Sequence, residues 1–163
     1  AHEEAHPVVL VRERKLVRHG FFSELPPSDN HLYTNGFKGR RVKTTNGRNI
    51  ANHLKSELLG QWMHLPALDQ NVPYGLVTVV FLSNLLNETF GRKGGTERRY
   101  KKLDASNRGK LIEDVVSELI GVDDSSAFDC LRLKRIGEPH AEVYVYEMEE
   151  AECLLTPDWL TLP

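Results

Sequence analysis

The sequence predicts an α+β fold, in which a mixed sheet of about four to six strands carries two main helices on one face. Leu76–Leu82 is almost wholly apolar, which is typical of a central strand buried on both faces. Asn107–Ile120 carries two adjacent apolar stripes at helical spacing, so a helix that lies flat on the sheet is predicted there. Phe128–Ile136 and Ala141–Met148 alternate around a turn at Gly137 and predict two further strands.

The first third of the chain predicts shorter elements. Val8–Val11 is a candidate strand, and Leu16–Leu25 is a second one that stops at Pro26-Pro27, because proline cannot donate to a strand ladder. Asn35-Gly36 and Lys38-Gly39 are turn signals, and they predict a small hairpin.

A helix and a loop are predicted around the central strand. Capping side chains in Thr44–Asn46 precede a helix from about Gly47 to His64, because apolar residues recur there every fourth position: Ile50, Leu54, Leu58 and Trp62. The polar, glycine-rich segment Asn84–Thr96 is predicted to be a loop, and Arg99–Asp104 a short strand. Gly121 is placed to end the second main helix.

Composition favours one soluble domain. The chain has 163 residues, of which 40% are hydrophobic and 27% charged, and this is enough to bury a core. No apolar run is long enough to cross a bilayer and no secretory signal is recognisable, so we expect a cytoplasmic protein without a membrane partner. Cys130 and Cys153 lack metal-site spacing and are expected to be free thiols.

Charge is segregated along the chain, although the net charge is only −2. Acidic residues gather near the C-terminal end. Basic residues form two clusters, the first being Lys38, Arg40, Arg41 and Lys43, and the second Arg92, Lys93, Arg98, Arg99, Lys101 and Lys102. Either cluster alone is equally consistent with a solvated face. Two basic clusters around one acidic motif favour contact with phosphates.

Aromatic residues lie within these basic clusters. Tyr33, Phe37 and Tyr100 are placed where rings can stack on nucleic-acid bases. For Tyr33 and Phe37, packing within the hairpin is an equally open interpretation.

The acidic motif begins with Asp104, continues with Lys110 and Asp114, and ends with Asp123-Asp124 past the predicted helix. Carboxylates are the hard oxygen ligands that Mg²⁺ prefers, and a nearby ammonium group can stabilise phosphate charge. Lys110 and Asp114 lie one helical turn apart, so a surface ion pair is their alternative interpretation. Beside a basic loop, the motif indicates metal-dependent chemistry on a phosphate backbone.

The sequence resembles the RusA family of Holliday junction resolvases and related phage endodeoxyribonucleases over most of Leu16–Glu149. Leu25–Asn30, Thr44–Gly47 and above all Asp104–Asp124 carry the resemblance. The positions in the third segment that fall on the family's scheme are Asp104, Asn107, Lys110, Asp114, Asp123 and Asp124.

The resemblance implies a function and a division of the chain. Asp104 and Asp124, with Asp123, are expected to hold Mg²⁺, or Mn²⁺ in its place, while Lys110 and Asp114 act in catalysis. A homodimer that cleaves branched DNA in recombination and repair is expected, in a bacterial or phage-encoded protein. Residues 1–15 then form an N-terminal extension, 16–150 the nuclease domain and 151–163 a C-terminal arm.

One position departs from the family's scheme. Ser106 stands where the family has a second aspartate, and a serine there binds a metal only weakly or through water. Ser106 also suits a helix N-cap, and Asn107 suits either a second cap or a residue that orients a ligand carboxylate. Ser106 therefore leaves open a DNA-structure-binding protein with weak or absent cleavage, and the acidic, apolar C-terminal arm leaves open a protein-interaction module.

Overall fold

The fold of the computed structural model is α+β, as the sequence predicts. The structure describes residues 14–28, 31–101, 106–150 and 153. In this part of the chain, the elements are β1 (Lys15–Phe22), β2 (Tyr33–Asn35), η2 (Phe37–Gly39), β3 (Arg41–Lys43), α1 (Thr45–Trp62), β4 (Tyr74–Leu82), α2 (Ser106–Ile120), η3 (Asp124–Ser126), β5 (Ala127–Ile136) and β6 (His140–Glu147). The predicted strand Val8–Val11 lies outside the described residues.

The main sheet is mixed and has four strands in the order β1-β6-β4-β5. β6 pairs antiparallel with β1 and with β4, whereas β5 runs parallel to β4. A parallel neighbour requires a crossover, and the chain between β4 and β5 supplies one that contains α2. β2 and β3 form the separate predicted hairpin.

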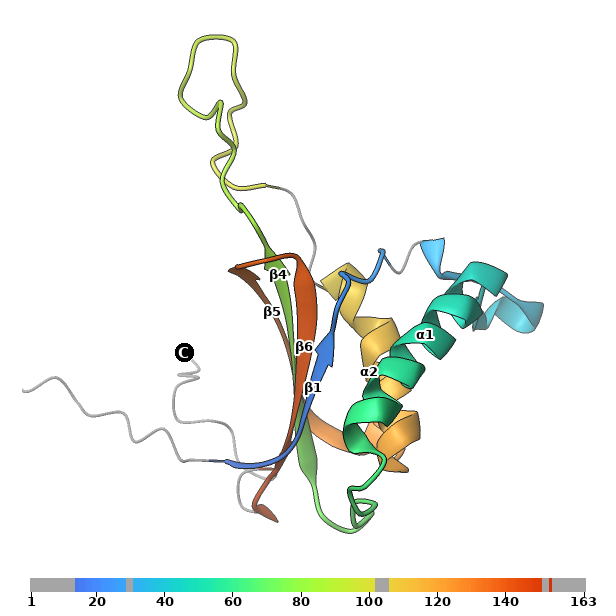
Figure 1. Ribbon diagram of the computed structural model, residues 1–163. Helices are drawn as coiled ribbons and strands as arrows, with labels where there is room; N and C mark the ends of the chain where they lie inside the picture. Colours follow the sequence, from blue (N-terminus) through green and yellow to red (C-terminus); the bar gives the residue numbers. More distant parts are fainter. Residues whose placement is uncertain (1–13, 29–30, 102–105, 151–152, 154–163) are drawn as a thin grey trace, which may run out of the picture.

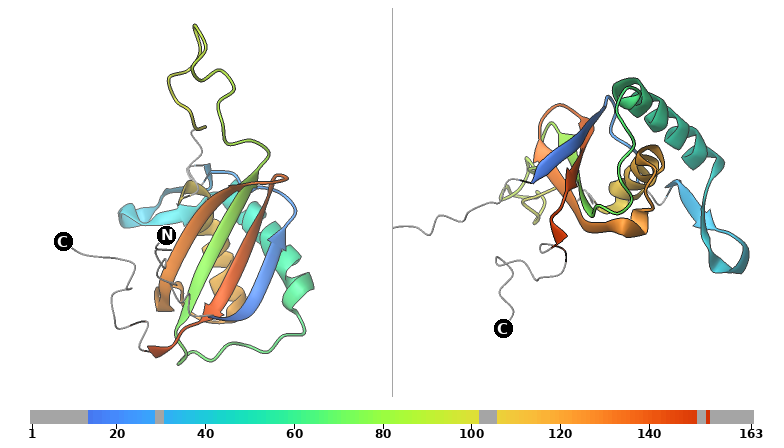
Figure 2. Two further views of the ribbon diagram at one scale, coloured as in Figure 1. Left: turned by 90° about the vertical axis from the view of Figure 1, so that its left-hand side faces the viewer. Right: turned by 90° about the horizontal axis from the view of Figure 1, so that it is seen from below.

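Both α1 and α2 cover the same face of the sheet, and neither of them lies on the opposite face (Figures 1 and 2). The core lies between these layers, because the buried stripes of the helices meet the inward side chains of β4 and β6. From α2 the core receives Leu111, Ile112, Val115, Val116 and Ile120, and from α1 it receives Ala51, Leu54, Leu58 and Trp62. The one stripe predicted for α1 and the two adjacent stripes predicted for α2 therefore face the core, although Ile50 and Leu119 are only partly buried.

Helix boundaries follow local hydrogen bonds. The side chain of Thr44 accepts a bond from the backbone N–H of Gly47 at 3.0 Å and caps α1, as the capping residues predict. Gly121 ends α2 with φ of 72°, a left-handed conformation that glycine adopts without a Cβ clash, and its N–H reaches the carbonyl of Ser117 at 3.1 Å.

One predicted strand end and one predicted strand are wrong, and α1 runs from Thr45 to Trp62 rather than from about Gly47 to His64. β1 ends at Phe22 rather than Leu25, because the backbone N–H of Ser23 turns to the Glu57 carboxylate of α1 at 2.9 Å. Arg99–Lys101 is not a strand: the N–H of Lys101 reaches the carbonyl of Leu85 at 2.8 Å, so the two legs of the loop bond each other instead of the sheet. The rest of that predicted strand lies outside the described residues.

Segment 83–101 projects from the end of β4 at the same end of the sheet as the start of α2 (Figure 1). No helix in the described part of the chain combines the length and apolar character needed to cross a lipid bilayer.

Candidate active site

The predicted pair on α2 forms as its spacing suggests. Nζ of Lys110 lies 3.5 Å from Oδ1 of Asp114, and the side chains are 41% and 21% exposed. Such a long, partly solvated pair contributes little to stability by itself. The pair matters for the site because of its position. Both groups lie on a helix whose opposite face is buried in the core.

Tyr33 joins this pair to the basic hairpin. Its hydroxyl donates a hydrogen bond to Oδ2 of Asp114 at 2.6 Å, although the two residues are 81 positions apart. Nζ of Lys110 lies 5.6 Å from the centre of the Tyr33 ring, and the guanidinium of Arg41 lies at the same distance. Tyr33 is buried, so its predicted base stacking is replaced by packing and by this bond.

Segments 25–28 and 44–47 are held by long-range hydrogen bonds, the first to α2 and the second to the residue before the hairpin. Arg108, in the first turn of α2, donates a hydrogen bond to the carbonyl of Pro26 at 2.5 Å. The N–H of Thr44 donates to the carbonyl of Leu32 at 2.8 Å, which ties the start of α1 to the hairpin. Long-range contacts of this kind leave no periodic signal in a sequence.

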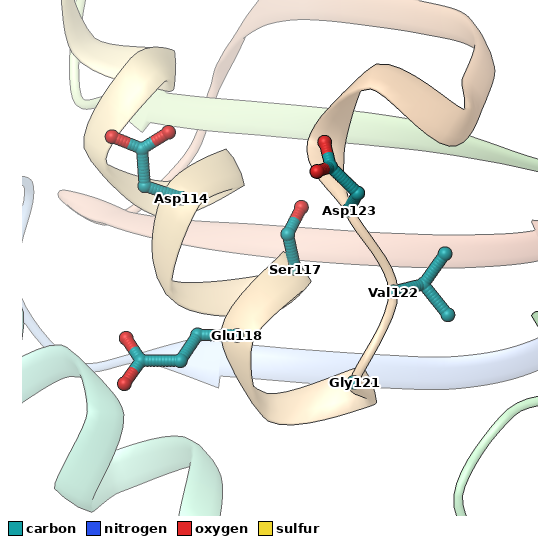
Figure 3. Close-up of a pocket in the computed structure, with 6 residues that line it drawn as sticks. All are labelled: Asp114, Ser117, Glu118, Gly121, Val122 and Asp123. Carbon is teal, nitrogen blue, oxygen red and sulfur yellow. The ribbon is translucent and has the colours of Figure 1, made fainter.

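A hollow of about 410 Å³ lies beside the second half of α2 (Figure 3). Its lining consists of Asp114, Ser117, Glu118, Gly121, Val122 and Asp123. Asp114 and Asp123 are thus brought to one hollow from the helix and from the segment beyond its end. Glu118 turns toward α1, where Nζ of Lys55 holds it at 2.6 Å.

Asp123 is held through both its side chain and its backbone carbonyl, which also accepts the N–H of Ser126 at 2.9 Å. Its carboxylate Oδ1 accepts the backbone N–H of Ser125 at 2.9 Å, and its backbone carbonyl accepts the hydroxyl of Tyr74 at 3.0 Å. Between Asp114 and Asp123, the buried Oγ of Ser117 lines the hollow and has no hydrogen-bond partner in the described part of the chain (Figure 3). A buried hydroxyl without a partner is costly in free energy, so Ser117 is an unpaired polar group beside this hollow. Sequence patterns gave no signal for Ser117.

Several predicted site residues cannot be compared with the expectation. Asp104 and Lys102 lie outside the described residues. Ser106 and Asn107 form the start of α2, and Asp124 begins η3, but the side chains of all three lie outside the described part. Whether Ser106 caps the helix and whether Asp124 meets Asp104 stay predictions. Within the described residues, no three His, Cys, Asp or Glu side chains form a group that would hold a metal ion.

A clamp from the sheet fixes the first half of α2. Arg132 of β5 donates to both carboxylate oxygens of Glu113, with Nε at 2.8 Å and Nη2 at 2.7 Å. Burial raises the pKa of Glu113, but the bonds from Arg132 and Cys130 and the positive charges of Arg132 and Lys110 outweigh it. The pKa of this carboxyl therefore lies below its ordinary value.

Both basic clusters are exposed on projections. The first lies on the β2–β3 hairpin and includes Lys38, Arg40 and Arg41; the second lies on segment 83–101 and includes Arg92, Lys93, Arg98, Arg99 and Lys101. The hairpin and segment 83–101 extend away from the sheet and helices (Figure 2). The electrostatic segregation of the sequence therefore corresponds to two separate positive projections.

The face of the sheet without helices holds a different cluster. His19 and His140 bond the Glu142 carboxylate at 2.8 and 3.1 Å, and the ring of His19 stacks on Tyr144. Burial raises the pKa of Glu142, but the bonds from the two histidines outweigh it and leave the pKa low. The sequence shows no ligand spacing for these histidines, and the cluster lies on the side of the sheet away from α2.

No protein-family model matches this chain, and no curated protein matches it.

Proposed function

We propose that this chain is a Mg²⁺-dependent endodeoxyribonuclease of the RusA type, which cleaves branched DNA such as Holliday junctions in recombination and repair. The observation that carries the proposal is the hydrogen bond between Tyr33 and Asp114. It joins a basic hairpin to the lysine–aspartate pair of α2, and so couples a surface suited to phosphates with a group suited to phosphoryl chemistry.

Lys110 is proposed as the cation that stabilises negative charge on the phosphate under attack. Its side chain is 41% exposed, so a phosphate can approach it. Asp114 orients it from one turn away, and Tyr33 holds Asp114 in place. Preorganised charge of this kind is often the largest contribution to catalysis.

Asp104 and Asp124, with Asp123, are proposed to hold Mg²⁺, for which Mn²⁺ can substitute. The donors that the hollow presents are hard oxygens, and the buried Ser117 hydroxyl adds another without a partner, so the chemistry of this side of α2 fits such an ion. When bound, the ion supplies Lewis-acid activation of water and of the phosphate. The remaining ligands of this proposal, Asp104 and the Asp124 side chain, lie outside the part that the structure describes.

The two positive projections are proposed to grip DNA backbones. The first cluster contributes Lys38, Arg40 and Arg41, and the second contributes Arg92, Lys93, Arg98, Arg99, Lys101 and Lys102. A branched substrate offers several duplex arms, which two separated projections can contact together. A homodimer would present two sites to the paired scissile strands of a junction. A cytoplasmic location in a bacterial or phage setting belongs to the same proposal.

The second candidate function is binding of branched DNA without cleavage. Ser106 favours it, because a serine stands where the family's scheme has a second aspartate and binds a metal only weakly or through water. This candidate keeps both basic projections and predicts junction binding with no Mg²⁺-dependent nicking.

The experiment compares a four-way junction, a fork and a linear duplex, each with and without Mg²⁺. We expect cleavage of the branched substrates only in the presence of Mg²⁺ or Mn²⁺, and binding in either case. Asp104→Asn should abolish cleavage and spare binding. Asp69→Asn is the matched control, since Asp69 is an exposed aspartate whose side chain accepts the Asn71 N–H in a loop far along the chain from the motif.

Each outcome separates the functions. Binding of junctions by the wild-type protein without nicking would support the second candidate. Absence of any salt-sensitive DNA affinity would instead favour a protein-interaction module. Equal cleavage by Asp104→Asn and the wild-type protein would contradict the assigned metal ligands.

A further inference from the structure

The tip of the β2–β3 hairpin carries a solvent-exposed aromatic ring. Phe37 is 85% exposed, more than any other large apolar side chain in the described part of the chain. A single exposed hydrophobic residue is ordinary and does not by itself mark a site. The backbone conformation, the charges and the attachment of this hairpin together indicate a binding role for the ring.

The backbone holds the ring outward. Lys38, the next residue, adopts φ of 57° and ψ of 30°, a left-handed conformation that is strained for a residue with a long side chain. The tip is closed by the N–H of Gly36, which reaches the carbonyl of Arg40 at 2.6 Å. A fixed tip loses little conformational freedom when a flat ligand packs on the ring.

The surroundings of the ring are positive. Nζ of Lys38 lies 5.5 Å from the centre of the Phe37 ring, and Arg40 and Arg41 follow on the same hairpin, all exposed. Residues 31–48 contain no aspartate or glutamate. A ligand for this tip therefore combines a flat apolar face with nearby negative charge, which is the chemistry of a nucleotide.

The second projection repeats the arrangement. Tyr100 is 60% exposed, and the guanidinium of Arg99 lies 5.7 Å from the centre of its ring. Each basic projection thus carries an exposed ring with a cation beside it, and the second projection also exposes Phe90. The hairpin is also fixed to the candidate active site, since Tyr33 at its base bonds Asp114.

We propose that Phe37 is a stacking platform for an unpaired DNA base, and that Lys38 and Arg40 bind the phosphates next to that base. This inference rests on the proposed function insofar as it takes DNA to be the ligand. A fully paired duplex keeps its base faces stacked on one another, whereas a branch point exposes them. Phe37 would therefore supply the preference for open, branched DNA, because every base has a face on which a ring can stack.

The test measures binding of a fork and of a linear duplex without divalent metal, with 2-aminopurine at the first unpaired position of the fork. We expect Phe37→Ala to bind the fork roughly tenfold more weakly, to leave duplex affinity unchanged and to lose the change in 2-aminopurine fluorescence that stacking causes. Phe37→Trp should restore both signals. Phe128→Ala is the control, because Phe128 is an exposed phenylalanine (56%) that lies on β5, outside both basic projections.

A charge variant separates stacking from electrostatics. Lys38→Gln should weaken fork and duplex binding alike and lower the salt dependence of both, while the fluorescence change persists. Circular dichroism of each variant checks that the fold is intact, which is expected for substitutions at an exposed tip.

The outcomes distinguish this inference from the proposed nuclease. If the wild-type protein binds and cuts the fork and Phe37→Ala does so equally well, the stacking role is overturned and the nuclease stands. If fork binding depends on Phe37 but no cleavage occurs with Mg²⁺, the stacking role stands and the nuclease fails. If the wild-type protein binds neither DNA, both are overturned.

Discussion

Gly109 lies directly against Arg132. A Cβ at position 109 would lie 2.6 Å from Nε and 2.7 Å from Cδ of the arginine, which is closer than such atoms approach in proteins. Arg132 cannot swing away freely, because the same guanidinium bonds both oxygens of Glu113. A glycine in the first turn of α2, which is costly for a helix, thus allows the sheet to clamp the helix that carries Lys110 and Asp114.

Gly109→Ala should destabilise the protein although alanine favours helices. Overpacking costs about 1–3 kcal/mol, against a gain of about 1 kcal/mol in helix propensity, so we expect a lower midpoint in urea unfolding. Gly60→Ala is the matched control in α1, where a Cβ meets nothing within 4 Å, and it should raise the midpoint. A higher urea midpoint for Gly109→Ala would instead show that Arg132 can move aside at little cost in free energy.

Glu113 should make stability depend on pH in the acid range. Its pKa is lowered from the ordinary value of 4.5 in the folded protein, so the folded state favours the carboxylate. The resulting stabilisation is present above 4.5 and is lost as pH falls through the folded pKa. Thermal unfolding measured between neutral and acid pH should show this loss of stability. In Glu113→Gln the stability should decrease less steeply as pH falls.

At neutral pH, Glu113→Gln should be less stable than the wild-type protein by about 1–3 kcal/mol, because Arg132 loses its charged partner. Glu118→Gln, on the exposed side of the same helix, should lose as much stability at acid pH as the wild-type protein does. If Glu113→Gln also loses as much stability at acid pH as the wild-type protein, other carboxyl groups cause the pH dependence.

Lys110→Met should separate catalysis from stability. The ammonium group is partly exposed, so the free energy of unfolding should change by less than about 0.5 kcal/mol. Cleavage of the junction should fall by about a hundredfold or more if this cation stabilises the reacting phosphate. Lys55→Met, which breaks the pair with Glu118, is the control and should cut at the wild-type rate.

Tyr33→Phe tests the link between hairpin and helix. Removal of the hydroxyl leaves Asp114 without this donor and should cost about 1 kcal/mol in stability. Cleavage should slow while DNA affinity is kept, since the basic residues remain. Tyr144→Phe deletes a hydroxyl that bonds Glu142 on the opposite face and should leave the cleavage rate unchanged.

Arg92 and Lys93 should contribute to DNA affinity through phosphate contacts alone. Replacing both by glutamine should weaken binding to all DNA shapes and reduce the slope of log affinity against log salt by about 1.8, that is about 0.9 for each contact. Lys15→Gln, in which a β1 lysine paired with Glu147 is neutralised, should preserve the slope. An identical slope in the double variant would remove segment 83–101 from the DNA interface.

Sequence periodicity was enough to predict most of the fold. The stripes of α1 and α2 and the apolar run of β4 mark residues that are buried in the core. Buried positions recur at every helical turn or at every second strand residue, so they can be recognised within a window of about 11–18 residues. The boundaries that failed, at Phe22 and around Arg99, depend on single long-range hydrogen bonds, which leave no such repeat.

The candidate site was less accessible to the same reasoning. The spacing of Lys110 and Asp114 predicts their contact, because a helix brings positions i and i+4 together. Tyr33 was expected to stack or to pack, and its bond to Asp114 joins residues that no local rule relates. Likewise, no local rule relates Arg132 to Glu113 or indicates that the Ser117 hydroxyl is buried.

The sequence by itself determined the fold class, the two amphipathic helices and the separation of acidic from basic residues, because these follow from local spacing and composition. Only the tertiary structure decided that Tyr33 meets Asp114, that Asp123 and Asp114 line one hollow, and that Phe37 stays bare. Contacts between distant segments depend on how whole layers pack, and packing is a property of the folded chain rather than of any window along it.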